Sequence, residues 1–263
     1  MLYFRRKNIL RRYIMENKIR ESVRCEKVLA WLEKYKEETK CEGVVLGISG
    51  GKDSTVVAML AKKVWGDNVV GVMMPNGTQA DISDSIEIVE TLGLRNCTVN
   101  LADAFSALCA EIEKKSSLEI SRQAKTNIPP RMRMTTLYAI AQTLGYRVIG
   151  TGNASEAFIG WTTKWGDGAY DLNPIAGLTC TEVMALGASL AKEFGLDEKF
   201  ARKAPSDGLT GRTDEDNFGF TYAELDNYIL NGECESDEVR EKIERMHKLS
   251  AHKRKMPEKF GVD

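Results

Sequence analysis

The sequence predicts an α/β protein: an open, doubly wound, mostly parallel sheet with helices on both faces, followed by a helical C-terminal extension. Two observations carry this prediction. Short apolar runs of strand length, such as residues 44–48 and 69–73, alternate with helical patterns of about 10–15 residues. Each run is continuously apolar, which is typical of a parallel strand buried on both faces. Helical patterns then dominate the last third of the chain.

The elements are expected in the following order. Strands are predicted at residues 44–48, 69–73, 97–99 and 146–149. Helices are predicted at residues 16–38, 55–65, 78–93, 102–119, 129–144, 179–194, 221–230 and 237–248. Proline is tolerated in the first turn of a helix, so Pro129 and Pro130 are expected to begin the helix that ends at Leu144. With no internal repeat and no low-complexity linker, residues 1–263 are expected to form a single domain.

The first 14 residues are basic: they contain Arg5, Arg6, Lys7, Arg11 and Arg12 and no acidic residue. Two interpretations are open. Either these residues have no function, because translation starts at Met15 or because they form a flexible arm, or they form a functional basic arm.

Composition narrows the class of protein. The chain has 37 Lys and Arg against 38 Asp and Glu, so no bulk attraction to nucleic acid is expected. No apolar run approaches the roughly 20 residues of a membrane helix. The six cysteines are scattered and include no Cys-x-x-Cys, which favours reduced thiols and a cytoplasmic location. With two histidines, a zinc site is excluded, so any metal is a hard cation on carboxylates.

The sharpest chemical signal is Ser49-Gly50-Gly51-Lys52-Asp53-Ser54, where the first apolar run meets a helix. Two glycines allow a tight turn and close approach to a ligand, and the helix start supplies unpaired N–H groups. Together they predict a phosphate cradle. A Walker A loop is excluded, because that motif needs glycine and a hydroxyl residue where this chain has Leu46 and Asp53. The plain alternative is a glycine-rich turn without a ligand.

This hexapeptide resembles the loop of the ATP pyrophosphatases, which cleave ATP between the α and β phosphates. Six further blocks resemble, in order, those of the NAD synthetase family, and the resemblance runs over roughly residues 27–260. The blocks are Met74–Asp81, Arg131–Met134, Gly150–Glu156, Thr163–Gly168, Asp171–Ile175 and His252–Arg254.

The resemblance implies ATP-dependent amidation of deamido-NAD by ammonia to give NAD. A carboxylate oxygen is a poor leaving group, so the acyl group must first be activated. The nicotinate carboxylate would attack the α phosphate of ATP and release pyrophosphate, and ammonia would then displace AMP from the acyl-adenylate. Such catalysis depends on positioning and charge neutralisation, which needs no histidine or cysteine nucleophile.

The resemblance also assigns residues to ATP and to Mg²⁺. The Mg²⁺ carboxylates would be Asp53 and Glu156, each next to a glycine-rich break at a strand end; a hard oxygen site suits that ion. The alternatives are a helix cap for Asp53 and a solvated loop acid for Glu156. The residues implied to bind ATP are Gly47, Ile48, Ser49, Gly50, Gly51, Lys52, Asp53, Ser54, Thr151 and Ser206.

A second group is implied to hold deamido-NAD. Basic side chains and a histidine facing the pyrophosphate and ribose of a dinucleotide are reasonable chemistry. A solvated basic C-terminal end is the alternative for the last two members. The group comprises Arg131, Lys164, Asp171, His252 and Lys253.

One position departs from the family pattern. The family usually carries a lysine that reaches the ATP phosphates shortly after Gly-Leu-Thr, where this chain has Cys180. A thiol cannot supply that charge. Lys52 or Lys203 could compensate.

Two rival classes share the phosphate loop. A tRNA-modifying enzyme usually needs reactive cysteines and a basic RNA-binding domain, and neither is visible. A catalytically inactive nucleotide-binding protein is supported by Cys180 and opposed by the two carboxylates.

The resemblance implies two further properties. Free ammonia is the expected nitrogen source, because the roughly 40 residues before the phosphate loop leave no room for a glutaminase domain; a separate glutaminase subunit stays open. A homodimer is expected, since the family builds the dinucleotide site across a two-fold interface. The helical segment 126–144 carries more apolar residues than one packed face needs, and an interface of this kind would bury them.

Overall fold

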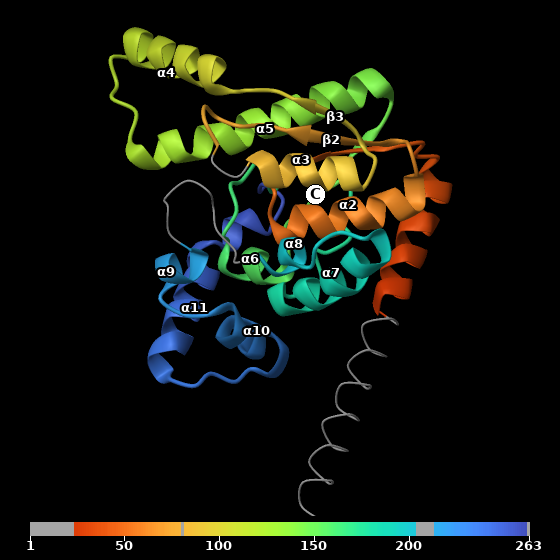
Figure 1. The fold of residues 1–263 in the computed structure, drawn as a ribbon. Helices are drawn as coiled ribbons and strands as arrows, with labels where there is room; N and C mark the ends of the chain where they lie inside the picture. Colours follow the sequence, from red (N-terminus) through yellow and green to blue (C-terminus); the bar gives the residue numbers. More distant parts are fainter. Residues whose placement is uncertain (1–23, 80–81, 204–212, 262–263) are drawn as a thin grey trace, which may run out of the picture.

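The computed structural model describes residues 24–79, 82–203 and 213–261. Its centre is a parallel sheet in the order β3-β2-β1-β4 (Figure 1). The order reverses beside β1, which pairs with β2 on one side and with β4 on the other. In open sheets, ligands bind beyond the carboxyl ends of the strands at such a point. The strands are β1 (Val44–Gly47), β2 (Val69–Met73), β3 (Arg95–Thr98) and β4 (Arg147–Val148).

Side chains of β1 alternate between two hydrophobic clusters, one on each face of the sheet. Val44 and Leu46 belong to the cluster that includes residues of α2 and α7, whereas Val45 belongs to the cluster that packs against α5. The predicted doubly wound fold with helices on both faces is therefore confirmed. The helices that follow the strands are α2 (Lys52–Trp65), α3 (Ile82–Thr91), α4 (Ala102–Ser116), α5 (Arg122–Leu144) and α6 (Ala154–Ile159).

The C-terminal third is helical, as the sequence predicts. Helices α9, α10 and α11 gather around a third cluster that includes Phe218, Leu225 and Cys180, the first residue of α7. The rest of α7 and α8 pack against α2 (Figure 1). Among the described helices, α6, α7, α9 and α10 begin with a capping box, in which the N-cap side chain and a carboxylate three residues later satisfy each other's backbone N–H groups. The elements are α7 (Cys180–Phe194), α8 (Lys199–Arg202), α9 (Asp214–Phe218), α10 (Tyr222–Asn231), α11 (Asp237–Leu249) and η1 (Ala251–Lys253).

The predicted start of α5 is wrong. The helix begins at Arg122, seven residues before the first proline, and both Pro129 and Pro130 lie inside it. Ser121 is the N-cap, and its side chain accepts a hydrogen bond from the N–H of Ala124 at 3.3 Å. Interior prolines lower helix stability because they lack the N–H donor. Ser121, a favourable N-cap residue, therefore predicts the start of α5 better than the two prolines do.

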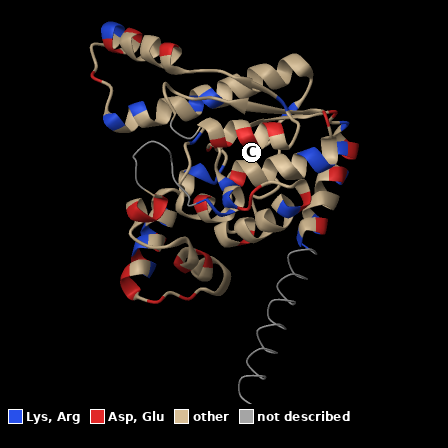
Figure 2. Ribbon diagram, viewed as in Figure 1, with Lys and Arg blue, Asp and Glu red and all other residues tan. Residues whose placement is uncertain are grey.

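The predicted arm, residues 1–14, lies outside the described residues. Among the residues that are described, no helix has the length and apolar character needed to span a membrane. Both blue and red segments are spread over the molecule (Figure 2), in keeping with the near-zero net charge.

Candidate active site

The predicted phosphate loop, residues 47–54, joins the end of β1 to the start of α2. Gly50 has a φ of 78°, in the left-handed region that favours glycine. A Cβ atom there would also lie 3.2 Å from Ser85 Oγ, so a side chain at this position would require Ser85 to shift. Gly51 follows in an extended conformation as the N-cap of α2.

The two serines of the loop hold its shape. Ser54 Oγ donates a hydrogen bond to the Gly51 carbonyl at 3.0 Å, and Ser49 Oγ accepts one from the Gly51 N–H at 3.2 Å. The two hydroxyls are themselves 3.1 Å apart. The loop therefore keeps a fixed turn at the positive end of the α2 dipole, where an anion is favoured.

A second loop follows β4. A Cβ at Gly150 would lie 2.4 Å from the ring of Tyr170, so only glycine allows this close approach. Thr151 lies in the same loop, which ends at Asn153, the N-cap of α6. Glu156 completes the capping box, its Oε2 accepting from the Asn153 N–H at 3.0 Å.

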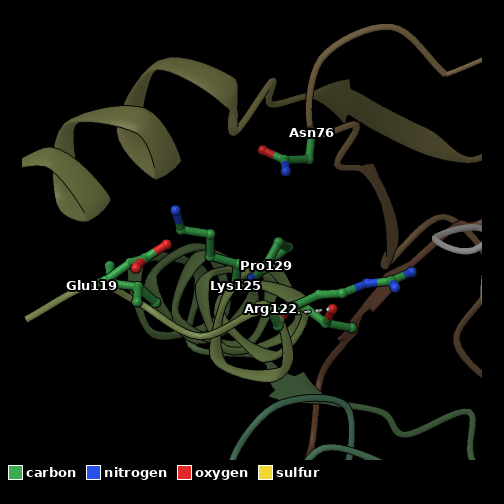
Figure 3. A pocket seen from close by; sticks show the side chains of 7 residues that line it. Asn76, Glu119, Arg122, Lys125 and Pro129 are labelled. Atoms are coloured by element: carbon green, nitrogen blue, oxygen red, sulfur yellow. Dashed lines mark hydrogen bonds between the residues drawn. The ribbon is translucent and has the colours of Figure 1, made fainter.

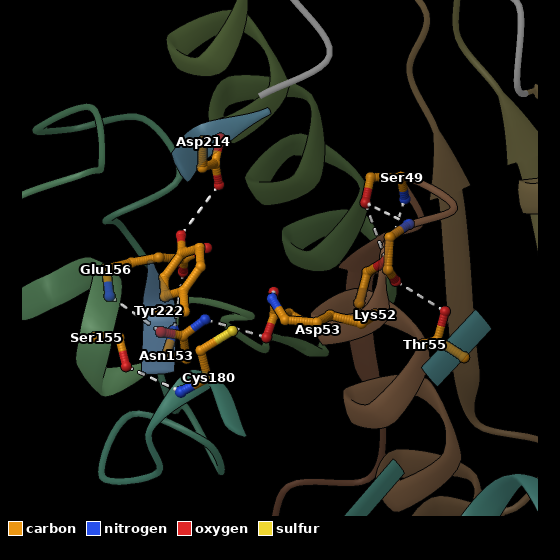
Figure 4. A network of polar contacts seen from close by, with 12 residues as sticks. Ser49, Lys52, Asp53, Thr55, Asn153, Ser155, Glu156, Cys180, Asp214 and Tyr222 are labelled. Carbon is orange, nitrogen blue, oxygen red and sulfur yellow. Dashed lines mark hydrogen bonds and ion pairs between the residues drawn. The ribbon is translucent and has the colours of Figure 1, made fainter. Parts of the chain in front are cut away.

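Asn153 links the two predicted metal carboxylates (Figure 4). Its buried amide donates to Asp53 Oδ1 at 3.2 Å, and its Oδ1 accepts from the Glu156 N–H at 3.0 Å. The two acids thus come together from the first turns of α2 and α6, the helices that follow the adjacent strands β1 and β4. Asp53 is not a helix cap, because Gly51 holds that position. Glu156 does have a capping role in addition to any metal role.

Lys52 extends into the same site. Its side chain is 2% exposed, and its Nζ pairs with Asp53 Oδ2 at 2.6 Å. The ammonium also lies 5.7 Å from the centre of the Tyr222 ring, whose hydroxyl donates to buried Asp214 at 3.0 Å. Figure 4 shows Lys52 and Asp53 extending from α2 toward Glu156 and Tyr222.

These contacts shift the acidity of the site. Burial and the neighbouring charge of Asp53 raise the pKa of Glu156, and Lys52 opposes them. Burial lowers the pKa of Lys52, but Asp53 and Glu156 outweigh it, so the pKa is raised and the ammonium stays charged.

The donor set fits Mg²⁺. Asp53 and Glu156 provide hard carboxylate oxygens. In the described part of the chain, no three or more His, Cys, Asp or Glu side chains form a cluster that could hold a metal ion. Mg²⁺ is usually held by one or two carboxylates together with waters and substrate phosphates, which is the arrangement that two acids beside a phosphate loop allow.

Four of the five residues predicted to hold deamido-NAD lie together. Arg131 Nε donates to the Lys164 carbonyl at 3.3 Å, and Lys164 Nζ donates to the His252 carbonyl at 2.8 Å. Lys253 Nζ is bound by the carbonyls of Gly160 and Thr162, at 2.8 and 2.7 Å. Lys253 therefore ties the C-terminal segment to the loop after α6, so its ammonium already has partners.

The fifth residue, Asp171, lies elsewhere. Its carboxylate accepts from the Val148 N–H at 2.8 Å and from the Tyr138 hydroxyl at 3.4 Å. Tyr138 is seven residues after Arg131 on α5, about two helical turns away. Ser206, predicted to contact ATP, lies outside the described residues.

Cys180 is the first residue of α7 and is fully buried. Burial raises the pKa of its thiol to about 12, so it is neutral beside Lys52. Of the two lysines considered as substitutes for a charge here, Lys203 pairs with Asp84 of α3 at 2.7 Å. Lys52 is the one that reaches into the site.

A separate hollow of about 460 Å³ lies between the segment after β2 and the start of α5 (Figure 3). Asn76, Arg122 and Lys125 line it, and Lys125 is paired with Glu113 at 3.0 Å. None of the predicted site residues that the structure describes lines this hollow.

The sequence prediction missed Asn153 and Tyr222. An asparagine three residues before a glutamate is a visible helix-start signature, so Asn153 could have been found. Tyr222 gives no local signal, since α10 reaches the site only through tertiary packing.

A phosphate loop at the end of a central parallel strand, with two linked carboxylates beside it, defines a nucleotide-binding protein of the α/β class. Residues 24–257 match the family model of NAD synthase. The chain is 43% identical over 235 residues to an NH₃-dependent NAD⁺ synthetase of Carboxydothermus hydrogenoformans, covering 89% of this chain and 95% of that protein. It is 40% identical to one of Finegoldia magna, covering 91% and 96%.

Solved structures agree. The fold matches the NMN synthetase of Francisella tularensis with a TM-score of 0.83 and 35% identity, covering 92% of this chain and 99% of that one. It matches the NH₃-dependent NAD synthetase of Campylobacter jejuni with a TM-score of 0.71 and 27% identity, covering the same shares. The chain belongs to the NAD synthase family. It is a ligase that forms an amide C–N bond, which confirms the predicted resemblance.

Proposed function

We propose that this chain makes NAD from deamido-NAD, ATP and ammonia. The nicotinate carboxylate attacks the α phosphate of ATP, pyrophosphate leaves, and the acyl-adenylate forms. Ammonia then attacks the acyl carbon, AMP leaves with the bonding electron pair, and the attacking nitrogen loses a proton to give the neutral amide. The observation that carries the proposal is the pair of carboxylates, Asp53 and Glu156, joined by Asn153 at the edge of the phosphate loop.

In this proposal, the loop of residues 47–54 holds the phosphates of ATP, with Thr151 and Ser206 as further contacts. Asp53 and Glu156 hold Mg²⁺, which neutralises phosphate charge when it is bound. The fixed turn that the loop serines maintain supports this assignment, because it presents a rigid cradle to an anion.

The proposed deamido-NAD site contains five side chains. Mutual contacts among Arg131, Lys164 and the segment that carries His252 support a shared surface. Asp171, held against β4, would contact a different part of an extended substrate. Lys253 would act chiefly by positioning the segment, because two carbonyls already bind its ammonium.

A shorter substrate is the second candidate. The Francisella tularensis protein, matched with a TM-score of 0.83, is described as an NMN synthetase. The same amidation applied to nicotinate mononucleotide would give NMN. Both substrates present the same nicotinate carboxylate, so the chemistry at the phosphate loop is unchanged.

Ammonia as nitrogen donor is supported by the curated relatives, which are named NH₃-dependent and are covered over 95–96% of their length. A homodimer is supported by α5, in which only Pro129 and Ala141 are buried although it carries many apolar residues. Leu108 and Ile112 of neighbouring α4 are also exposed. A cytoplasmic location stays a prediction, in keeping with six unpaired cysteines.

The experiment is a set of parallel incubations with ATP and Mg²⁺. Each contains deamido-NAD or nicotinate mononucleotide, and either ammonium or glutamine, and AMP, pyrophosphate and the amide product are measured. We expect deamido-NAD with ammonium to give equal amounts of AMP and NAD. A faster reaction with the mononucleotide would favour the second candidate, and ADP in place of AMP would refute the adenylate route. Light scattering with a mass near 29.3 kDa at full activity would refute the dimer.

A further inference from the structure

Lys52 is an unusual residue for its position. It is the first residue of α2, and side chains at helix ends normally extend into solvent, yet this one is 2% exposed. Its ammonium pairs with the adjacent residue, Asp53, at 2.6 Å, although neighbours in a helix seldom face each other. Burying a lysine is costly unless its charge is compensated, so the surroundings must favour a cation at this point.

Those surroundings are acidic. Asp53 and Glu156 both act on the Lys52 ammonium, the face of the Tyr222 ring lies 5.7 Å away, and buried Asp214 lies behind the Tyr222 hydroxyl. Cys180, on the remaining side, is a neutral thiol. The ammonium thus compensates Asp53 directly, and it opposes the burial and the Asp53 charge that raise the pKa of Glu156.

A metal ion and this ammonium need the same oxygens. Asp53 cannot give its full charge to Mg²⁺ while Lys52 holds its Oδ2. Mg²⁺-ATP brings further negative charge to the adjacent loop, and Lys52 belongs to that loop through its own backbone. The flexible four-carbon stem of Lys52 would let its ammonium turn to a phosphate bound at that loop.

We propose that Lys52 is a positioning cation that exchanges partners: without nucleotide it occupies the carboxylate pair in place of the metal, and with Mg²⁺-ATP it turns to the phosphates and leaves Asp53 to the metal. The nucleotide half of this proposal rests on the proposed function, whereas the metal half does not. Lys52 thereby makes metal binding depend on the nucleotide.

The first test measures metal alone. Mn²⁺ binding without nucleotide is followed by electron paramagnetic resonance in the wild type and in Lys52→Gln. Removing the competing ammonium should tighten Mn²⁺ binding by about tenfold, since a nearby unit charge is worth at least that much. Lys62→Gln, on the same helix but paired with Asp67 at 3.0 Å, is the matched control and should bind as the wild type does.

The second test measures ATP binding by calorimetry in saturating Mg²⁺, without the acyl substrate. Lys52→Gln should bind ATP about tenfold more weakly, because a phosphate partner is lost. Lys52→Arg should restore most of the affinity. If Lys52 had a purely structural role, its replacement would weaken the binding of both Mn²⁺ and ATP. Opposite changes in the two affinities would therefore identify the exchange of partners.

Unchanged or weaker Mn²⁺ binding in Lys52→Gln would overturn the proposal, and unchanged ATP affinity would overturn its nucleotide half. Lys52→Met, an apolar side chain of similar length, is measured in parallel in case the amide of Gln is not tolerated. If the wild type made no AMP with any acyl substrate, the proposed function would fail, while the Mn²⁺ result would still decide the role of Lys52.

Discussion

Asp53→Asn separates the charge of this residue from its shape. Asparagine keeps the size of the side chain and an oxygen that can accept from the Asn153 amide, but it removes the anion 2.6 Å from the buried ammonium of Lys52. Breaking a buried ion pair by removing one partner costs about 3–5 kcal/mol. Glu156 still compensates Lys52 in part, so we expect the lower limit, about 3 kcal/mol. In a chain of this size, that lowers Tm by about 6–12 °C.

The fold should survive, since a typical domain has a stability of about 5–15 kcal/mol. Calorimetry in metal-free buffer measures the loss of stability, and a pyrophosphate assay should show little adenylate formation, with partial rescue at raised Mg²⁺. The control is Lys52→Gln combined with Asp53→Asn, which should recover at least half of the lost stability because no buried charge is left unpaired. Wild-type Tm together with normal pyrophosphate release at ordinary Mg²⁺ would refute the reasoning.

Three other changes test the rest of the site. Asn153→Ala removes the cap of α6 and the link between the carboxylates, so it should cost about 1–2 kcal/mol in calorimetry and weaken Mn²⁺ binding in a titration. Burial and Asp53 raise the pKa of Glu156 from 4.5 to about 8. The contribution of protonated Glu156 to stability is therefore complete at low pH and is lost as the pH rises from 4.5 to about 8. In thermal melts without metal, the wild type should lose stability over this pH range relative to Glu156→Gln. A thiol reagent at neutral pH should label exposed Cys97 and spare buried Cys180, whose pKa is about 12, and mass spectrometry measures the labelling. The variant Cys180→Ala should release pyrophosphate at nearly the wild-type rate.

The sheet could be predicted because its central strands are apolar throughout. Both β1 and β2 are buried on two faces, so their sequences contain almost nothing but apolar residues and glycine. The edge strand β3 is exposed along its whole length and lacks such a pattern, and the predicted strand at 97–99 overlaps only the end of the observed Arg95–Thr98. Local pattern therefore locates a strand to the extent that the strand is buried.

The same distinction applies to the site residues: positions that follow from local pattern could be predicted, and those that depend on tertiary packing could not. Asp53 and Glu156 could be brought together from sequence, because each follows a strand and parallel strands end at one edge of the sheet. The inward direction of the Lys52 side chain could not be predicted, because it depends on Tyr222 of α10, which is 170 positions away in the chain. The separation of Asp171 from the Arg131 group also depends on tertiary contacts, because Asp171 is held by β4 and by Tyr138, seven residues beyond Arg131 on α5, and no motif encodes these contacts.

Asn153 explains why two carboxylates can share this edge without metal. One amide must donate to Asp53 and at the same time accept from the backbone of α6, and a side chain that both donates and accepts in a fixed plane meets this need. Aspartate would cap α6 equally well. It would, however, place a third negative charge where Asp53 now has a donor, and Lys52 would then compensate three carboxylates. The amide therefore serves the charge balance of the site as much as the start of the helix.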